Sequence, residues 1–402
     1  MPDTKLFGQA YKRDPFPTLK ALIDQGPVAE GRVPVIGRAL MAVTRASAQD
    51  LLKDCDRFCV DGRNAGKSSQ MGVPFLPKRF HLLANNMLGH DDPEHRRLRQ
   101  MADGPFLKPR IDALRPAVER ETAQLLDAME GEPRVDLVET LARPLPLIVI
   151  CELLGLPRED RAQFTQWMGV FGRAGNLFGL FQLWPTLGRL INYLRDDFET
   201  VRKTPREGLI SELIHNPEGG VPLSDDELLS MVFMLFIAGH ETTTHFISSA
   251  VWTLLGDPAA REAFTSEAVP SEAAVEELLR YCGPVRSSTP RLAREDTELL
   301  GVPVKRGQRV FAYLAAANMD ADVFETPFTL DLARTPNRHL TFGGGPHICL
   351  GLHLARLEGA VALRALFRRW PALGPASDLN EMEWIPRYGV RGLKSLPVSL
   401  VR

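Results

Sequence analysis

The sequence predicts a mainly α-helical protein with small β-sheets, an α+β fold built around a long central helix. Three observations lead to this prediction. Helical hydrophobic periodicity prevails from residue 92 onward, one helix candidate at 224–256 is far longer than the others, and extended pieces are short and confined to the first 60 residues and to 298–312. With 402 residues, of which 44% are hydrophobic, the chain can bury a large core. Length alone allows one large domain or two ordinary ones, and no repeat or low-complexity tract divides residues 1–402.

The remaining elements are shorter. The sequence predicts strands at 32–41, 298–304 and 308–312, helices at 46–53, 111–129 and 137–154, and one last long helix after the proline-rich stretch that ends near 340. Asp92 is expected to cap a further helix, with Pro93 in its first position, where the missing amide hydrogen does no harm. The aromatic-rich segment 166–187 is expected to form helices joined by a mobile loop over a pocket, although ordinary core aromatics would explain it equally well.

The longest helix candidate has clear ends. It opens with a capping box, Ser224 and Glu227, and stops at 256–258, a Gly, an Asp and a Pro. At 1.5 Å per residue, a helix over 224–256 spans roughly 45 Å, the width of a whole domain. Its middle, 231–238, is almost entirely apolar, which indicates a helix that is buried on every side.

Composition argues against several classes of protein. The formal charge of −2 is nearly balanced, so no overall field would attract nucleic acid or an anionic membrane. No apolar stretch approaches the roughly 18 residues that cross a bilayer, and no secretion signal is recognisable, so we expect a cytoplasmic protein. The five cysteines are scattered without a CxxC pair, which indicates neither a disulfide framework nor a structural zinc site.

The sharpest motif is a glycine-rich loop around a single cysteine. It runs from Phe342 through three consecutive glycines to Cys349, and it directly precedes the last long helix. Amides near a helix N-terminus lower the pKa of a thiol, and glycines let the backbone approach a flat ligand, so a thiolate here would be a good iron ligand. Two other interpretations stay open: a phosphate loop, disfavoured because Ile348 holds the third glycine position of GxGxxG, and a buried structural cysteine.

A second motif interrupts the apolar middle of the long helix. It consists of Ala238, Gly239, His240, Glu241, Thr242 and Thr243. Glycine and a run of threonines each weaken a helix interior, and threonine hydroxyls can bond backward and bend the helix, so we expect a local bend. An acid beside a hydroxyl in such a buried helix can relay protons to dioxygen, whereas a packing kink with a satisfied Glu241 explains the same residues equally well.

Two charged pairs carry little information by themselves. Glu277 and Arg280 lie three residues apart on one helix face, and His95 and Arg99 lie four apart on another. Pairs of this kind are usually solvated salt bridges, so neither pair alone indicates a site.

Together, these motifs resemble those of the cytochrome P-450 family, in the family's order and spacing over 80–402 and more loosely before residue 80. The loop at 342–351 is similar to the heme-binding signature of Phe, Gly-rich positions, a basic residue, Cys and Gly. The segment 238–243 is similar to the oxygen-activation motif Ala-Gly-x-Asp/Glu-Thr-Thr. One position departs from the commonest form, because His347 stands where many members carry Arg.

The resemblance implies a role for each matching residue. Glu241 and Thr242 would be the acid and the alcohol of proton delivery, and the Glu277–Arg280 pair would join Arg334 to fix the fold behind the heme. The implied cofactor-binding residues are Cys349 as the iron ligand, His95, Arg99, Arg291 and His347 on the heme propionates, and Phe342, Gly343, Ala238 and Gly239 around the ring.

The resemblance further implies a heme-thiolate monooxygenase that binds heme b and inserts one atom of O2 into a hydrophobic small molecule. No flavin or nicotinamide fingerprint occurs in the chain, so a ferredoxin or flavodoxin-type donor with its reductase is expected to supply electrons. The cations expected at its docking face are Arg96, Arg97, Lys108, Arg110, Arg364, Arg368 and Arg369. A peroxide-driven heme-thiolate enzyme and a non-catalytic heme or ligand sensor stay as alternatives.

Substrate contacts are expected in the segments that match the family's variable contact regions. These are 62–86, 168–187, 233–242, 285–289 and 386–388, whose apolar content favours a hydrophobic ligand. Arg286 is expected to face solvent, although it would otherwise suit an acidic group of a substrate. Steroids, terpenoids, fatty acids and polyketides are all compatible with such walls.

Overall fold

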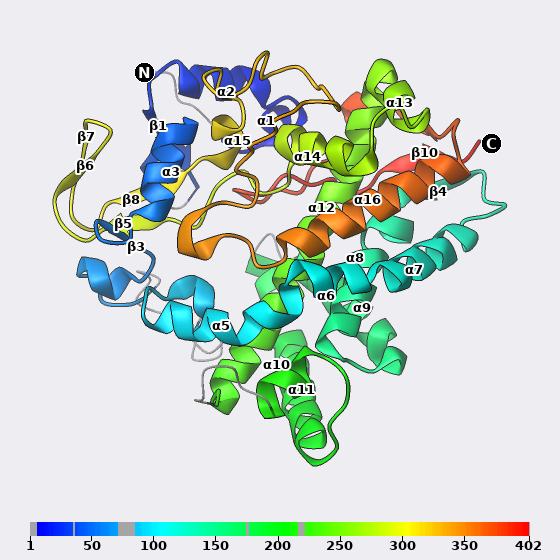
Figure 1. Cartoon of the computed structure of the whole chain (residues 1–402), viewed down its shortest axis with the longest axis horizontal. Coiled ribbons are helices and arrows are strands. Elements are labelled where there is room, and N and C mark those ends of the chain that lie inside the picture. Colours follow the sequence, from blue (N-terminus) through cyan, green and yellow to red (C-terminus); the bar gives the residue numbers. More distant parts are fainter. Residues whose placement is uncertain (1–5, 35–36, 71–84, 174–176, 216–221, 402) are drawn as a thin grey trace.

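The computed structural model describes residues 6–34, 37–70, 85–173, 177–215 and 222–401, and it is mainly helical with small sheets, as predicted (Figure 1). The helices are α1 (Gln9–Arg13), α2 (Phe16–Ile23), α3 (Arg45–Lys53), α5 (Glu94–Phe106), α6 (Lys108–Ala113), α7 (Arg115–Asp127), α8 (Pro144–Leu154), α9 (Arg161–Arg173), α10 (Leu177–Lys203), α11 (Leu209–His215), α12 (Asp225–Gly256), α13 (Pro258–Thr265), α14 (Ser271–Cys282), α15 (Leu314–Ala317) and α16 (Leu352–Arg369). The strands are β1 (Val28–Val33), β2 (Gly37–Ala42), β3 (Phe58–Cys59), β4 (Arg134–Asp136), β5 (Arg291–Ala293), β6 (Thr297–Leu299), β7 (Val302–Val304), β8 (Arg309–Ala312), β9 (Gly374–Pro375) and β10 (Pro397–Ser399).

The long helix α12 runs through the middle of the molecule, with α8 and α16 packed against it (Figure 1). Its capping box forms as predicted, because Ser224 and Glu227 each accept from the other's backbone amide. The predicted interruption at 238–243 leaves the helix intact. The hydroxyls of Thr242 and Thr243 donate to carbonyls four residues back, as expected, and the segment stays α-helical throughout.

Several predicted boundaries are wrong, and proline explains two of them. The helix expected at 111–129 is two helices, α6 and α7, because Pro116 cannot donate to a carbonyl in the preceding turn. The helix expected at 137–154 begins with a π-helical turn over 138–142 and continues as α8 from Pro144. Asp92 does not cap α5. Pro93 occupies the cap position, and the Asp92 carboxylate accepts from Arg96 instead. Within 166–187 the structure has α9 and α10, and the residues between these helices, 174–176, where the expected loop would fall, lie outside the described residues.

The largest sheet joins the two strand-rich parts of the sequence. Its order is β1-β2-β8-β5-β3, with β2 and β8 parallel and the other neighbours antiparallel. Smaller sheets have the orders β4-β10-β9 and β6-β7. In the register of the large sheet, Arg291 of β5 pairs with Val310 of β8, which fixes the arginine backbone in the interior. None of the helices in the described part of the chain has the length and hydropathy of a bilayer-spanning segment.

Candidate active site

The cysteine loop is shaped by one hydrogen bond and by two glycines. The amide of Cys349 donates to the carbonyl of Phe342 at 2.9 Å and closes the loop. Gly343 and Gly345 have φ angles of 74° and 67°, the left-handed region that glycine adopts without strain. A Cβ at Gly345 would lie 2.1 Å from the carbonyl oxygen of Leu52. The end of α3 therefore approaches the loop this closely only because residue 345 is glycine.

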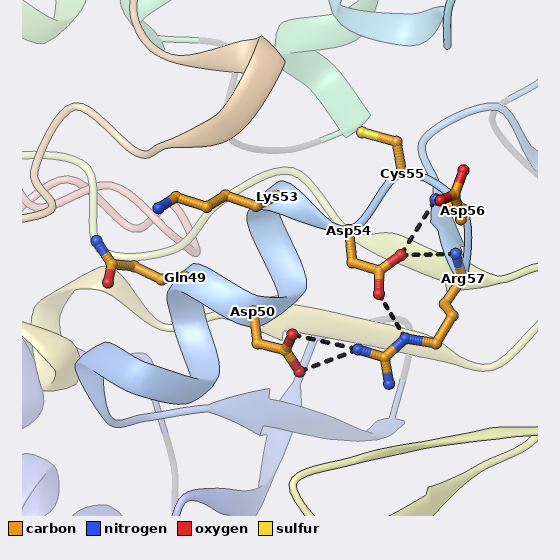
Figure 2. A pocket seen from close by; sticks show the side chains of 7 residues that line it. All are labelled: Gln49, Asp50, Lys53, Asp54, Cys55, Asp56 and Arg57. Carbon is orange, nitrogen blue, oxygen red and sulfur yellow. Dashed lines mark hydrogen bonds and ion pairs between the residues drawn. The ribbon is translucent and has the colours of Figure 1, made fainter.

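The end of α3 is held by a charged network beside this contact (Figure 2). Arg57 donates from Nε to Asp54 and from Nη2 to both carboxylate oxygens of Asp50, at 3.2 and 3.1 Å. The network borders a hollow of about 750 Å³, and Figure 2 shows the sulfur of Cys55 pointing away from the charged groups. The hollow contains none of the predicted site residues. Its network fixes the chain that follows α3, and thereby the backbone that supports the cysteine loop.

The thiol of Cys349 opens onto a recess inside the protein. The residue is exposed, yet burial raises the pKa of its thiol, so its accessible surface faces inward rather than the outer surface. The Gly351 amide, which donates to the sulfur, and the cations Arg99 and Arg356 lower the pKa without outweighing burial. The expected lowering of the pKa is therefore wrong for the free thiol. Binding to a metal ion deprotonates a thiol outright.

The four residues predicted to bind propionates come together although they belong to three parts of the chain. His95 and Arg99 lie on α5, Arg291 lies on β5, and His347 lies in the cysteine loop, with its ring 4.0 Å from that of His95 between centroids. Burial and the nearby Arg291, His95 and Arg99 lower the pKa of His347 to about 2. Burial also lowers the pKa of Arg291. The cluster is thus an enclosed, positively charged group of side chains.

This cluster fits the carboxylates of a heme. Arg291 is only 4% exposed and donates to Thr289 Oγ1 at 3.2 Å, and no carboxylate among the described residues lies within ion-pair distance of it. Nδ1 of His347 is buried without a hydrogen-bond partner. Burying a guanidinium without a counter-ion is unfavourable, so an anionic ligand that reaches Arg291 and His347 would stabilise the site. Arg99 is already engaged by Asp103 and by the Ile348 carbonyl, which ties α5 to the cysteine loop.

On α12, the predicted acid and alcohol are adjacent and differently bonded. Thr242 Oγ1 donates to the Ala238 carbonyl at 2.9 Å. Glu241 accepts from Arg387, and its Oε1 lies 3.8 Å from Nε2 of His245. Burial opposes ionisation of Glu241, but His245 and Arg387 outweigh it and lower the pKa to about 2. Ala238 is exposed whereas the residues next to it on α12 are buried or half-buried, so its side chain borders open space, as the thiol of Cys349 does.

The buried charged network predicted behind the loop forms in full. Glu277 and Arg280 are completely buried, and both carboxylate oxygens of Glu277 accept from Arg280 at 2.7 Å. Arg334 Nε donates to the same carboxylate at 3.2 Å, as the resemblance implied. Arg280 also donates to the carbonyls of Asn318 and Pro327, at 2.9 and 2.7 Å. The network thus joins α14 to the chain on the way to the cysteine loop.

Two site residues were missed by the sequence analysis. Arg356 of α16 lies over the ring of Phe342, 4.6 Å from its centroid, and is held by Glu276. Arg387 binds Glu241 across 146 positions of the sequence. A spacing of seven residues between Cys349 and Arg356 would place Arg356 one turn into the last helix, but no sequence pattern signals the Arg387 contact.

One further expectation is wrong, and the expected docking face stays a prediction. Arg286 does not face solvent. It is 3% exposed, and its Nε and Nη2 have no hydrogen-bond partner among the described residues. Six cations of the expected docking face are neutralised in ion pairs: Arg96 by Asp92, Arg97 by Glu94 and Glu227, Lys108 by Asp112, Arg110 by Glu212, Arg368 by Glu267, and Arg369 by Asp127 and Glu130. The seventh, Arg364, donates to the carbonyls of Phe264 and Val269. These cations do not form an unpaired basic patch.

An accessible cysteine that is enclosed by protein atoms, with a buried cluster of arginines and histidines next to its loop, defines a protein built to bind a heme through sulfur. Comparison with known proteins agrees. The family model for "Cytochrome P450" matches residues 185–376. Polyketide biosynthesis cytochrome P450 PksS of Bacillus subtilis is 37% identical, over 98% of this chain and 97% of its own length. Cytochrome P450 monooxygenase PikC of Streptomyces venezuelae is 37% identical, over 98% and 93%.

Solved structures are equally similar. Myxobacterial cytochrome P450 CYP267B1, in complex with myristic acid, superposes with a TM-score of 0.90 at 35% identity, over 99% of both chains. The structure of PksS superposes with a TM-score of 0.89 at 35% identity, over 98% of this chain and 99% of that one. The chain belongs to the cytochrome P450 family, whose members bind heme, and it is an oxidoreductase of the monooxygenase type.

Proposed function

We propose that this chain binds heme b through the Cys349 thiolate and inserts one oxygen atom of O2 into a hydrophobic small molecule, as one domain over 1–402. The observation that carries the proposal is the enclosed but accessible thiol of Cys349, in a loop whose His347 lies near Arg291, a buried guanidinium that forms no ion pair with a described residue. When bound, the heme supplies dioxygen activation, and thiolate ligation favours cleavage of the O–O bond. The protein then has to hold the heme, orient the substrate, exclude water and deliver protons.

The residues around the recess divide these tasks. Arg291, His95, Arg99 and His347 would bind the propionates, and the unpaired Nδ1 of His347 favours this role. The open space beside Gly343, where a Cβ would meet no atom within 4 Å, suits close approach of a flat ligand next to Phe342. Ala238 would border the ring, where its small, exposed side chain leaves room for dioxygen. Gly239 would contribute only backbone there, because a Cβ on it would lie 3.0 Å from Cδ1 of Ile150 in α8.

Glu241 and Thr242 would deliver the protons. With a pKa of about 2, Glu241 is ionised at neutral pH, so its carboxylate would accept hydrogen bonds from water molecules that carry protons to the site. Thr242 keeps two lone pairs free while it donates to the Ala238 carbonyl, so its oxygen can accept a hydrogen bond from a bound water or oxygen ligand. The pair disfavours a peroxide-driven enzyme, which would need no such relay. Rapid turnover with hydrogen peroxide and no reductase would favour that alternative.

Electrons would come from a separate ferredoxin or flavodoxin-type protein with its reductase, in the cytoplasm. The absence of a flavin or nicotinamide fingerprint from the sequence supports this part of the proposal. The substrate would be apolar over most of its length, since Phe233, Met234 and Ile237 of α12 lie in the expected contact segment. The named relatives include a polyketide biosynthesis enzyme and a protein crystallised with myristic acid.

The decisive experiment is the absorption spectrum of the purified protein, reduced and exposed to carbon monoxide. We expect a strongly red-shifted Soret band in the wild type and its loss in Cys349→Ala. Cys55→Ala, which changes the exposed cysteine of the hollow in Figure 2, is the matched control and should keep the band. An imidazole-type band in both wild type and Cys349→Ala would refute thiolate ligation. A normal band without reductant use, with any donor or ligand tried, would instead favour the non-catalytic sensor.

A further inference from the structure

We propose that the substrate carries an acidic group and that Arg387 binds it as a carboxylate. The inference rests on the proposed function and names a substrate class for the same site. Arg387 lies in the segment 386–388, one of the expected substrate walls, and it binds Glu241 of α12. A guanidinium offers a planar fork of donors that matches a carboxylate, so the arginine is suited to hold such a group.

The charge of the expected wall segments supports an anionic substrate. The described residues of the segments 62–86, 168–187, 233–242, 285–289 and 386–388 include five Lys and Arg residues but one acid, Glu241. The chain as a whole has a net charge of −2, so a positive excess is not a general property of its sequence. Arg63 is neutralised by Asp61 just outside them, and the excess remains after that pair is removed.

Arg387 has hydrogen-bond donors that remain available for a ligand. Its Nη1 donates to Glu241, while no acceptor among the described residues lies within hydrogen-bond distance of its Nε or Nη2. Its side chain is 40% exposed, and that of Glu241 is 25% exposed. Glu241 follows the exposed Ala238 by three residues and therefore lies on the same face of α12. The free edge of the guanidinium would then border the space that a substrate enters.

Behind Arg387 lies a group of buried cations without counter-ions. Lys12, Arg286 and Arg391 are 2%, 3% and 4% exposed, and none of them forms an ion pair with a described residue. Burial, followed by Arg387 and Arg391, lowers the pKa of Lys12 to about 8. Burial, followed by Arg286, lowers that of Arg391 to about 9. These cations repel one another, and an anion bound at Arg387 would relieve the repulsion.

The backbone keeps these cations close to the wall. Nζ of Lys12 donates to the carbonyls of Arg387 and Val390, at 2.7 and 3.0 Å, and to that of Ile385. The amide of Arg286 donates to the Gly389 carbonyl at 2.8 Å, which joins the wall segments 285–289 and 386–388. The positive charge therefore belongs to the wall itself and does not depend on a flexible surface side chain.

A carboxylate on Arg387 would also change the environment of Glu241. The charged groups that face Glu241 are Arg387, His245 and, on the same helix, His240. A substrate carboxylate would share Arg387 and add negative charge, which makes protonation of Glu241 easier. Binding of an acidic substrate would thus prepare the acid for proton delivery.

The test compares dodecanoate with dodecanol, which share a chain length and differ in charge. Isothermal titration of the heme-loaded protein measures both affinities without requiring turnover. We expect wild type to bind dodecanoate about tenfold more tightly than dodecanol, the ratio that one partly buried ion pair supplies. Arg387→Gln should remove this preference by weakening dodecanoate alone, and Arg387→Lys should restore part of it. Lys394→Gln, which breaks an ion pair with Glu383 at a side chain of similar exposure, should leave the preference unchanged.

Equal affinities in wild type, no binding of dodecanoate, or an undiminished preference in Arg387→Gln would overturn the inference. The carbon monoxide spectrum of each variant reports its folding and its thiolate ligation independently. If that band is present and dodecanol is bound or oxidised without any preference for dodecanoate, the inference fails while the proposed function stands. If the band is absent from wild type, the proposed function itself fails.

Discussion

Replacing Glu277 by Gln should destabilise the protein strongly while leaving its shape unchanged. The carboxylate accepts hydrogen bonds from Arg280, Arg334, Asn337 and the amide of Asp331, all within 3.2 Å. The substitution removes the only negative charge at the centre of this network and turns an amide donor toward guanidinium donors. Breaking a buried ion pair by neutralising one partner costs about 3–5 kcal/mol.

That free energy converts into a measurable shift of the melting temperature. A chain of 402 residues has an unfolding entropy of about 0.8 kcal/mol per kelvin near its melting temperature, so the expected shift is about 4–6 °C downward. Thermal unfolding followed by circular dichroism measures it. Glu267→Gln breaks the exposed pair with Arg368 and is the control, which should melt with wild type. A Glu277→Gln melting temperature within about 1 °C of wild type would refute the reasoning.

Three further predictions concern the site. Thr242→Ala should lower the amount of product formed per electron consumed about tenfold or more and raise peroxide release, because only a hydroxyl can relay the proton. Thr242→Ser should keep the wild-type yield per electron, and an unchanged yield in the alanine variant would remove Thr242 from the relay. Arg291→Met should speed heme transfer to apomyoglobin about tenfold, since one charged contact to a propionate is lost, and an unaltered rate would remove Arg291 from the propionate site. The pKa of Glu276 is lowered to about 2 from 4.5 although burial opposes ionisation, because Arg356 and His339 outweigh it. The ionised Glu276 carboxylate therefore stabilises the folded protein by about 3 kcal/mol above pH 4.5, and this stabilisation is lost as the pH falls toward 2. Arg356→Met should lose most of this stabilisation above pH 4.5, so its melting temperature should change less than that of wild type between pH 4.5 and 2. A pH profile of the melting temperature identical to that of wild type would contradict this.

The sequence predicts the structure best where a feature depends on residues that are close together in the chain. The capping box at Ser224, the glycine loop before Cys349 and the pair Glu277 and Arg280 are all local, and each lies in the structure where the pattern indicates. The helix boundary near Pro116 also has a local signal, the proline itself, which the predicted helix at 111–129 overlooked. The burial of Arg286 was not predictable in this way, because it depends on which face of an extended segment the neighbouring loop covers.

The contact between Arg387 and Glu241 illustrates a different limit. The two residues are 146 positions apart, and neither lies in a pattern that requires the other. Their pairing follows from the path of the loop at 385–391. Lys12 fixes that path, because its ammonium group donates hydrogen bonds to backbone carbonyls of the loop. A carbonyl contact leaves no signature in the sequence, because every residue has a carbonyl. Interactions of this kind become visible only in three dimensions.

Because Lys12 anchors that loop, the five-residue helix α1 determines where the loop carrying Arg387 lies. The ammonium group of Lys12 donates to the carbonyl of Ile385, 373 positions later in the sequence, so α1 holds a loop near the other end of the sequence in place. Shortening the protein from the amino terminus as far as Lys12 would release the loop that carries Arg387. The chemistry at the recess would then change without any substitution among the residues that line it, and variants made for expression should keep α1 whole.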